Sequence, residues 1–248
     1  MNKLSTIKPI TAHTSPHIEE LEAKIAFEDE VWATKTAMLG LEEIKKNGLK
    51  KASAFLYQDA HVFSKLLELD REHMIPEKVR CEAALYHFDD RGDLYPNIHR
   101  YVRKSLKYRP DDWDADMPEV LRGRKEYVVY RGGGESIGKV GKGLSWSLSR
   151  DIAEFFAERK TYYGFEAQHI YRGVIDADQI IAYLSGRDEF EIVQYNSVRD
   201  IEELTPIGMT KEYMALRDAE DSDDRDEKIA AYVCRQILSG EGAKSDTQ

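Results

Sequence analysis

The sequence predicts an α+β fold in which a helical lobe precedes a region of β-strands. Two observations lead to that prediction. Up to about residue 110 the apolar residues recur every three or four positions, which is the period of an amphipathic helix. Beyond Arg124 the period shortens, and β-branched and aromatic residues cluster in short runs that are typical of strands. A chain of 248 residues is long enough for one domain with a sizeable core, with or without an accessory lobe.

The first part of the chain is expected to be a flexible arm followed by helices. Residues 1–17 are polar and contain Pro9 and Pro16, which favours an arm without regular structure. The helical lobe is expected over residues 18–124, with four helices before Pro110 ends the last one. Each helix is marked by apolar residues at helical spacing: Phe27, Val31, Met38 and Leu41; Phe55, Val62 and Leu66; Cys81, Leu85 and Phe88; Val102 and Leu106.

Residues 125–205 are expected to form the functional core. Its three clearest strands are Glu126–Arg131, His169–Ile175 and Glu189–Tyr195. A helix is predicted from Arg150 to about Lys160, with Ser149 as its N-cap. Residues 206–248 are expected to hold an acidic connector and a C-terminal helix, whose apolar stripe is Ile229, Val233 and Ile237.

Charge and composition disfavour several classes of protein. The 46 acidic and 36 basic side chains give a formal net charge of −10, which repels nucleic-acid phosphates unless basic residues cluster on one face. Cys81 and Cys234 have no paired spacing, and the seven histidines have no ligand spacing, so neither a disulfide framework nor a bound metal is expected. The N-terminus lacks the apolar run of a signal peptide, and no segment reaches the roughly 20 apolar residues that span a bilayer. We therefore expect a cytoplasmic protein with no membrane partner.

The first motif with chemical content begins at Tyr130-Arg131-Gly132-Gly133-Gly134 and continues with Ser145-Trp146-Ser147. A strand that ends in an exposed arginine, followed by a glycine-rich turn and a capped helix, would look much the same. A P-loop is a second alternative, because Gly133 to Lys139 has the glycines and lysine of that motif. However, Val140 occupies the position where a hydroxyl would hold magnesium, and glycines follow where a phosphate-binding helix should begin.

The second motif is the pair Glu189 and Glu191 on the last predicted strand. Alternate side chains of a strand share one face, so the two carboxylates would point to the same side and Phe190 to the other. Taken alone, such a pair would indicate the exposed polar face of an edge strand. Its position after the arginine and the two serines, however, favours a functional interpretation.

An arginine at the end of one strand, a Ser-x-Ser strand start and a Glu-x-Glu strand, in that order, resemble the arginine-serine-glutamate class of mono-ADP-ribosyltransferases. The resemblance covers residues 126–195, about a third of the chain. Trp146 replaces the commoner middle threonine of the serine motif, as in bacterial and phage members of the class. The string Tyr-Arg-Gly recurs at Tyr171-Arg172-Gly173, but it follows the serines and therefore has the wrong order.

The resemblance implies a split, mainly antiparallel sheet that holds NAD, and it implies a role for each motif residue. Glu191 would stabilise the positive charge that develops on the ribose when nicotinamide leaves. Arg131 would bind the pyrophosphate, and Ser145 would orient Glu191 or the ribose. Glu189 would position or deprotonate the nucleophile of the acceptor. The implied NAD contacts are Arg131, Gly132, Ser145, Trp146, Ser147, Tyr162 and Tyr163.

The function implied is transfer of ADP-ribose from NAD to a macromolecular acceptor, either a protein arginine or a nucleic-acid base. By analogy with the class, such a compact transferase is expected to be a toxin of a toxin-antitoxin or phage-defence system, with a neutralising partner such as an antitoxin. Two alternatives stay open at this point. An NAD glycohydrolase would use the same arginine and glutamate but pass the sugar to water, and a non-catalytic interaction module would keep the fold without turnover.

Overall fold

The computed structural model describes residues 16–90, 95–134, 136–162, 169–184, 190–218 and 225–245. The chain divides into two compact units, Met1–Ile75 and Pro76–Gln248. The helical lobe expected over residues 18–124 therefore contributes to both units. No helix in these described ranges is both long enough and apolar enough to cross a membrane.

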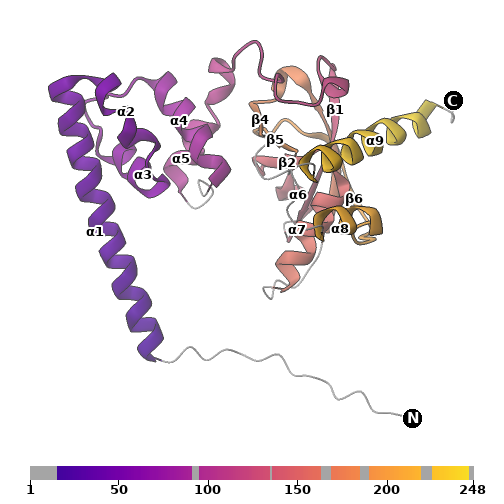
Figure 1. The fold of residues 1–248 in the computed structure, drawn as a ribbon, viewed down its shortest axis with the longest axis horizontal. Helices are drawn as coiled ribbons and strands as arrows, with labels where there is room; N and C mark the ends of the chain where they lie inside the picture. Colours follow the sequence, from indigo (N-terminus) through magenta and orange to yellow (C-terminus); the bar gives the residue numbers. More distant parts are fainter. Residues whose placement is uncertain are drawn as a thin grey trace. The chain divides into compact units, whose positions relative to one another are not determined.

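The first unit consists of α1 (Pro16–Asn47), α2 (Leu49–Tyr57) and α3 (Ala60–Leu69), which pack against one another (Figure 1). The apolar stripe of Phe55, Val62 and Leu66 predicted one helix, and this prediction is wrong because the stripe belongs to two. The break occurs at Asp59, whose carboxylate accepts hydrogen bonds from the backbone nitrogens of His61 and Val62 and so caps α3.

Helix α1 is buried through its small residues and exposes large ones. Ala33 and Ala37 are fully buried, and a side chain on Gly40 would meet the Phe55 ring at 3.1 Å. The small residues let α2 and α3 approach closely, whereas Phe27 and Met38 are 67% and 52% exposed. The helix runs well past its two neighbours (Figure 1). The apolar spacing thus indicated a helix correctly without indicating the buried face.

The second unit begins with short helices: α4 (Glu77–Asp90), α5 (Pro96–Val102), η2 (Ser105–Tyr108) and η3 (Glu119–Leu121). A hydrogen bond joins Arg80 of α4 to Tyr101 of α5, both of which are buried. Arg109, just after η2, donates to the backbone oxygens of Ala177 and Ile180 at 2.7 and 2.5 Å. Burial lowers the pKa of this guanidinium, and its two carbonyl acceptors attach the helices to the sheet region.

Within the described residues, the sheet has six strands, each antiparallel to its neighbours, in the order β4-β5-β2-β1-β3-β6. The strands are β1 (Glu126–Gly133), β2 (Ser145–Ser147), β3 (His169–Asp176), β4 (Ala182–Leu184), β5 (Glu191–Val193) and β6 (Arg199–Leu204). The α+β prediction is confirmed, and so are the strands expected at Glu126 and His169. Strands β4 and β6 were not predicted, because each is short or strongly charged. Arg172, in the second Tyr-Arg-Gly string, pairs with Glu202 across β3 and β6 at 2.8 Å.

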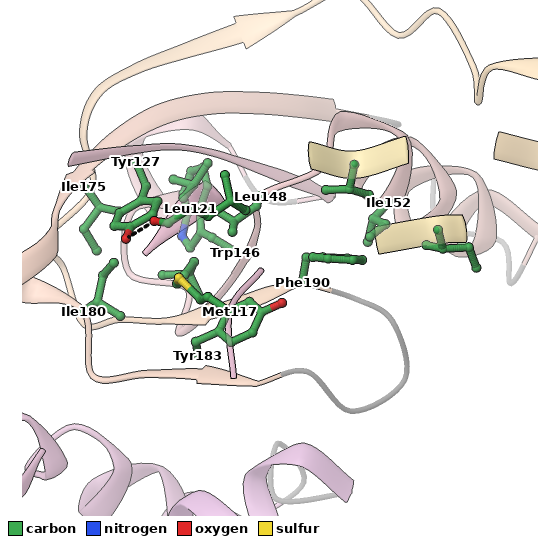
Figure 2. Packing of buried hydrophobic residues seen from close by; sticks show 14 of the residues in the cluster. Met117, Leu121, Tyr127, Trp146, Leu148, Ile152, Ile175, Ile180, Tyr183 and Phe190 are labelled. Carbon is green, nitrogen blue, oxygen red and sulfur yellow. Dashed lines mark hydrogen bonds between the residues drawn. The ribbon is translucent and has the colours of Figure 1, made fainter. Parts of the chain in front are cut away.

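One face of the sheet packs on a core of large side chains (Figure 2). Trp146 and Tyr127 are 1% and 2% exposed, and the Tyr127 hydroxyl donates to the backbone oxygen of Leu121 at 2.8 Å. Leu121 lies in η3, so this bond ties the segment before the sheet to β1. Residues of α8 (Lys211–Asp218) and α9 (Arg225–Ser245) complete the cluster: Tyr213, Ile229, Tyr232 and Val233.

Helix α7 (Arg150–Tyr162) lies against β1 and carries two buried carboxylates. Asp151 accepts hydrogen bonds from the Thr210 backbone nitrogen and the Tyr232 hydroxyl, both at 2.6 Å. Burial and this carboxylate raise the pKa of Tyr232 to about 12. Glu154 accepts from Arg150 and from the backbone nitrogens of Ile207 and Gly208. Both carboxylates therefore anchor the segment between β6 and α8.

Candidate active site

A cavity of about 170 Å³ lies where α7 meets the centre of the sheet. Its wall includes three residues of β1, three of β2, three of α7 and one of β5: Tyr130, Arg131, Gly132, Ser145, Trp146, Ser147, Ile152, Ala153, Phe156 and Glu191. The arginine, the Ser-x-Ser motif and the second glutamate are far apart in the sequence. The fold brings them into one cavity wall.

The cavity lies where two neighbouring strands of the sheet pair over the shortest length. Strands β1 and β2 pair through Tyr130 and Ser147, whereas β1 and β3 pair over the whole length from Glu126 to Gly133. Three strands thus lie on each side of a short central junction. The described strands form one continuous sheet with a short junction between β1 and β2, and not the split sheet that the resemblance implied. A weakly paired centre leaves room beside β1 for a ligand.

Glu191 begins β5 and is only 5% exposed. It is directly opposite Ser147 of β2, and Ser147 is in turn opposite Tyr130 of β1. Opposed residues of antiparallel strands have Cβ atoms about 4.5–5.5 Å apart and share a face. Tyr130, Ser147 and Glu191 therefore form one row across three strands. A carboxylate held in this row, away from bulk water, acts on a positive charge more strongly than it would at the surface.

The residue before Glu191 fixes the start of its strand. Phe190 has φ of 48°, in the left-handed region that bulky residues rarely adopt. Its ring is 5% exposed, and its carbonyl accepts a hydrogen bond from the Leu148 nitrogen at 3.0 Å. The buried ring and this bond hold the strained backbone in place. We infer that they set the direction in which the Glu191 side chain leaves the strand.

Arg131 also lines the cavity, and its guanidinium group lies against the chain at Ser145 and Gly143. Its Nη1 donates to the backbone oxygen of Ser145 at 2.5 Å. A Cβ atom on Gly143 would approach the Arg131 Cζ to 2.7 Å, so the guanidinium lies against the Gly143 backbone. Gly143 therefore has to lack a side chain for Arg131 to take this position. A fixed guanidinium with forked donors suits a pyrophosphate or a carboxylate.

Gly132 contributes to the cavity wall, and its lack of a side chain has a packing reason. A Cβ atom there would come within 1.8 Å of the Ala153 backbone oxygen and 2.8 Å of the Ala157 nitrogen. Helix α7 thus touches the β1 backbone at this point. The close approach places Ile152 and Phe156 of α7 over the strands.

Two buried polar atoms near the cavity have no hydrogen-bond partner within the described part of the chain: Trp146 Nε1 and Ser149 Oγ. The predicted N-cap at Ser149 is therefore wrong in its side-chain contact. Instead, Ser147 Oγ accepts a hydrogen bond from the Ser149 nitrogen at 3.0 Å. Trp146, expected to contact NAD, lines the cavity and also fills the core (Figure 2).

Two of the expected site residues, Glu189 and Tyr163, lie outside the described residues. Tyr162 ends α7, but its side chain is also outside the described part. The P-loop alternative gains no support, because the helix after Gly133 is α6 (Ile137–Val140), only four residues long.

The sequence did not reveal Gln194, which organises one end of the site. It is fully buried just after β5, and its Nε2 donates to the backbone oxygens of Gly141, at 3.2 Å, and Gly143. Its Oε1 accepts from the Ser197 nitrogen at 2.8 Å. Gln194 thus ties the loop beside Arg131 to the strand of Glu191. A polar residue directly after an apolar strand was the only signal.

The site combines one cation, one buried carboxylate, two serine hydroxyl groups and one tyrosine in a small cavity. Clefts that bury a drug-sized ligand usually enclose about 300–1,000 Å³. The volume of about 170 Å³ therefore suits one end of a dinucleotide rather than the whole molecule. The residues present fit the nicotinamide end of NAD, because Glu191 can face a sugar that gains positive charge while Arg131 faces a phosphate.

No protein-family model, no curated protein and no solved structure matches this chain.

Proposed function

We propose that the protein is a mono-ADP-ribosyltransferase that transfers ADP-ribose from NAD to a macromolecular acceptor. The observation that carries this proposal is the position of Glu191, a buried carboxylate opposite Ser147 in the wall of a cavity that also contains Arg131. Three motifs that are separate in the sequence contribute to one site, in the order found in the arginine-serine-glutamate class.

The proposed chemistry assigns a different task to each of these residues. Arg131 binds the pyrophosphate and fixes the dinucleotide in the cleft. Glu191 stabilises the positive charge on the ribose as the bond to nicotinamide breaks, and nicotinamide leaves with the electron pair of that bond. Ser145 and Ser147 orient the ribose and the carboxylate. The acceptor then attacks the sugar carbon and loses a proton, which Glu189 is proposed to receive.

The class of the resemblance also supports a biological role as a toxin of a toxin-antitoxin or phage-defence system. A partner that neutralises the enzyme would then be expected. This part of the proposal depends on analogy with the class alone.

Labelled NAD tests the proposal. Purified protein is incubated with NAD, with and without cell lysate, and nicotinamide release and labelled acceptor are measured side by side. We expect labelled macromolecule with lysate and slow nicotinamide release without it. If free ADP-ribose is the sole product under both conditions, the protein is an NAD glycohydrolase. If NAD is neither bound nor consumed, the protein is a non-catalytic module.

Variants of the two charged residues connect this activity to the site. Arg131→Lys is expected to weaken NAD binding roughly tenfold or more, because an ammonium cannot reproduce the forked contact of a guanidinium. Glu189→Gln is expected to lose transfer while keeping slow cleavage by water, since the sugar can gain charge without deprotonation of the acceptor. Unchanged NAD affinity in Arg131→Lys would return this arginine to a structural role.

A further inference from the structure

A basic surface lies beside the strand that carries Glu191. Residues 95–109 contain five lysines and arginines and no aspartate or glutamate, in a chain whose net charge is −10. Four of them lie within eight residues, from α5 to η2, and are exposed: Arg100, Arg103, Lys104 and Lys107. Together with Tyr195, these four residues are called the basic surface below.

The cations of this surface are organised by aromatic rings. Arg80, Arg100 and Lys104 surround the ring of Tyr101 at 5.5, 5.4 and 5.4 Å from its centroid. Tyr101 is 5% exposed, and Arg80 donates to its hydroxyl at 2.6 Å. A buried ring that contacts three cations partly offsets the repulsion between them and so holds them close to one another.

The carboxylates nearby neutralise only part of the charge. Glu77 bonds to both Lys104 and Lys107, and these two bonds lower the pKa of Glu77 to about 2. Arg100 and Arg103 form no ion pair with any carboxylate in the described ranges. Two exposed guanidinium groups are thus left to face solvent, beside two lysines that share one carboxylate.

The basic surface is connected to the site through β5. The guanidinium of Arg103 lies 4.9 Å from the centroid of the Tyr195 ring, and Tyr195 is 44% exposed. Tyr195 is four residues beyond Glu191, so even a fully extended chain would separate them by at most about 14 Å. Gln194, between them, is fully buried and bonded to the loop beside Arg131. The surface and the cavity therefore belong to one rigidly connected region.

We propose that the basic surface binds a single-stranded polynucleotide and that the acceptor of the ADP-ribose is a base of that strand. Arginines and lysines contact the phosphates, and the exposed aromatic ring of Tyr195 stacks on an unpaired base. An arginine-bearing protein segment fits less well, because like charges would face each other. This inference rests on the proposed function. It chooses between the two acceptor classes that the sequence left open.

The transfer step balances without a further reactant. A nitrogen or oxygen atom of the base forms a bond to the ribose carbon that nicotinamide leaves, and nicotinamide takes the electron pair of the broken bond. The proton lost by the base passes to Glu189, as in the proposed function, and from there to solvent. A paired base in a duplex would be out of reach, so we expect single strands to be preferred.

Binding without NAD tests the surface separately from any catalysis. A 20-nucleotide single strand, as RNA and as DNA in separate titrations, is measured against salt concentration. Four phosphate contacts predict a slope of about −3 in log affinity against log salt, since each contact to a single strand contributes about 0.7. The charge-reversed variant Arg100→Glu/Arg103→Glu is expected to bind at least tenfold more weakly. Tyr195→Ala is expected to bind about tenfold more weakly with an unchanged salt slope.

The matched control is Lys50→Glu/Lys51→Glu, which makes the same change in net charge at exposed lysines of α2. The control should bind like the wild type. Equal losses in the two charge-reversed variants would mean that net charge alone matters and would overturn the proposal. No detectable binding by the wild type at low salt would overturn it as well.

Digestion of the labelled lysate tests the acceptor class. We expect nuclease to remove the label and protease to leave it. We also expect Arg100→Glu/Arg103→Glu to lose labelling of the acceptor but to keep the nicotinamide release that is measured without acceptor. Label that only protease removes would assign a protein acceptor and overturn the inference, while leaving the proposed transferase function intact. An absence of nicotinamide release in the wild type would instead refute the proposed function.

Discussion

The cavity lies between α7 and the strands, and the buried carboxylates on these two sides differ in what they contact. On the α7 side, the carboxylates of Asp151 and Glu154 are buried and turned toward backbone nitrogens and a tyrosine hydroxyl of the 205–232 region. Neither lines the cavity. Their hydrogen bonds hold one segment of the chain to another, so we assign them to stability.

On the strand side, Glu191 is equally buried but lines the cavity opposite Ser147, with Arg131 nearby on the same wall. The three buried carboxylates of this unit therefore have two kinds of surroundings. Burial alone does not distinguish Glu191 from the other two, and its contact with the cavity does. Changes on the α7 side should lower stability, and changes on the strand side should lower activity.

The largest expected effect is at the point where the two sides touch. Gly132→Ala places a methyl group within 1.8 Å of the Ala153 backbone oxygen, which cannot move without shifting α7. We expect a loss of about 3 kcal/mol in the free energy of unfolding, at the upper end for overpacking. That corresponds to a fall of roughly 6–12 °C in melting temperature. A melting temperature within a degree of the wild type would show that α7 does not pack on β1 as described.

Gly143→Ala tests the strand side with the same addition of one methyl group. Here the nearest atoms belong to the Arg131 guanidinium, at 2.7 Å from the added carbon, and they can move. We therefore expect a nearly unchanged melting temperature and NAD affinity reduced about three- to tenfold, because a displaced guanidinium loses part of a charged hydrogen bond. Isothermal titration with NAD measures this. Full affinity would show that the position of Arg131 does not matter.

The smallest expected effect comes from a carboxylate away from both sides of the cavity. Lys104 and Lys107 hold the pKa of Glu77 at about 2, below its ordinary value of 4.5. A lowered folded-state pKa contributes stability that is present above pH 4.5 and is lost as the pH falls toward 2. Glu77→Gln should therefore be slightly less stable than the wild type at neutral pH, and the difference should vanish over that range. Urea unfolding at several pH values checks it, and a constant difference would contradict it.

Strands were predicted more accurately than helix faces, for a physical reason. The runs at Glu126 and His169 are rich in β-branched and aromatic residues, and a strand has only two faces to choose between. Helix α1 instead carries apolar residues on several faces, and its packing selects Ala33 and Ala37 because they permit close approach. The spacing of Phe27 and Met38 contained no information about that choice.

The sequence predicted those parts of the candidate site whose motifs lie on strands. Arg131, Ser145, Ser147 and Glu191 share one cavity wall, as the order of their motifs suggested. The contributions of α7 and Gln194 could not be predicted, because they depend on which helix covers the sheet and on how a loop returns to β5. Such tertiary contacts leave no periodic pattern in the sequence.

The most direct test compares two buried glutamates, Glu191, which lines the cavity, and Glu154, which does not. Glu191→Gln and Glu154→Gln each remove one buried charge while keeping the shape of the side chain. Nicotinamide release and melting temperature are measured for both. We expect Glu191→Gln to lose at least a hundredfold in turnover with little change in melting temperature, and NAD still to bind. Glu154→Gln should melt several degrees lower, because it weakens hydrogen bonds to a charged group, and should keep most of its turnover. Near-normal nicotinamide release by Glu191→Gln would contradict the assignment of the active site.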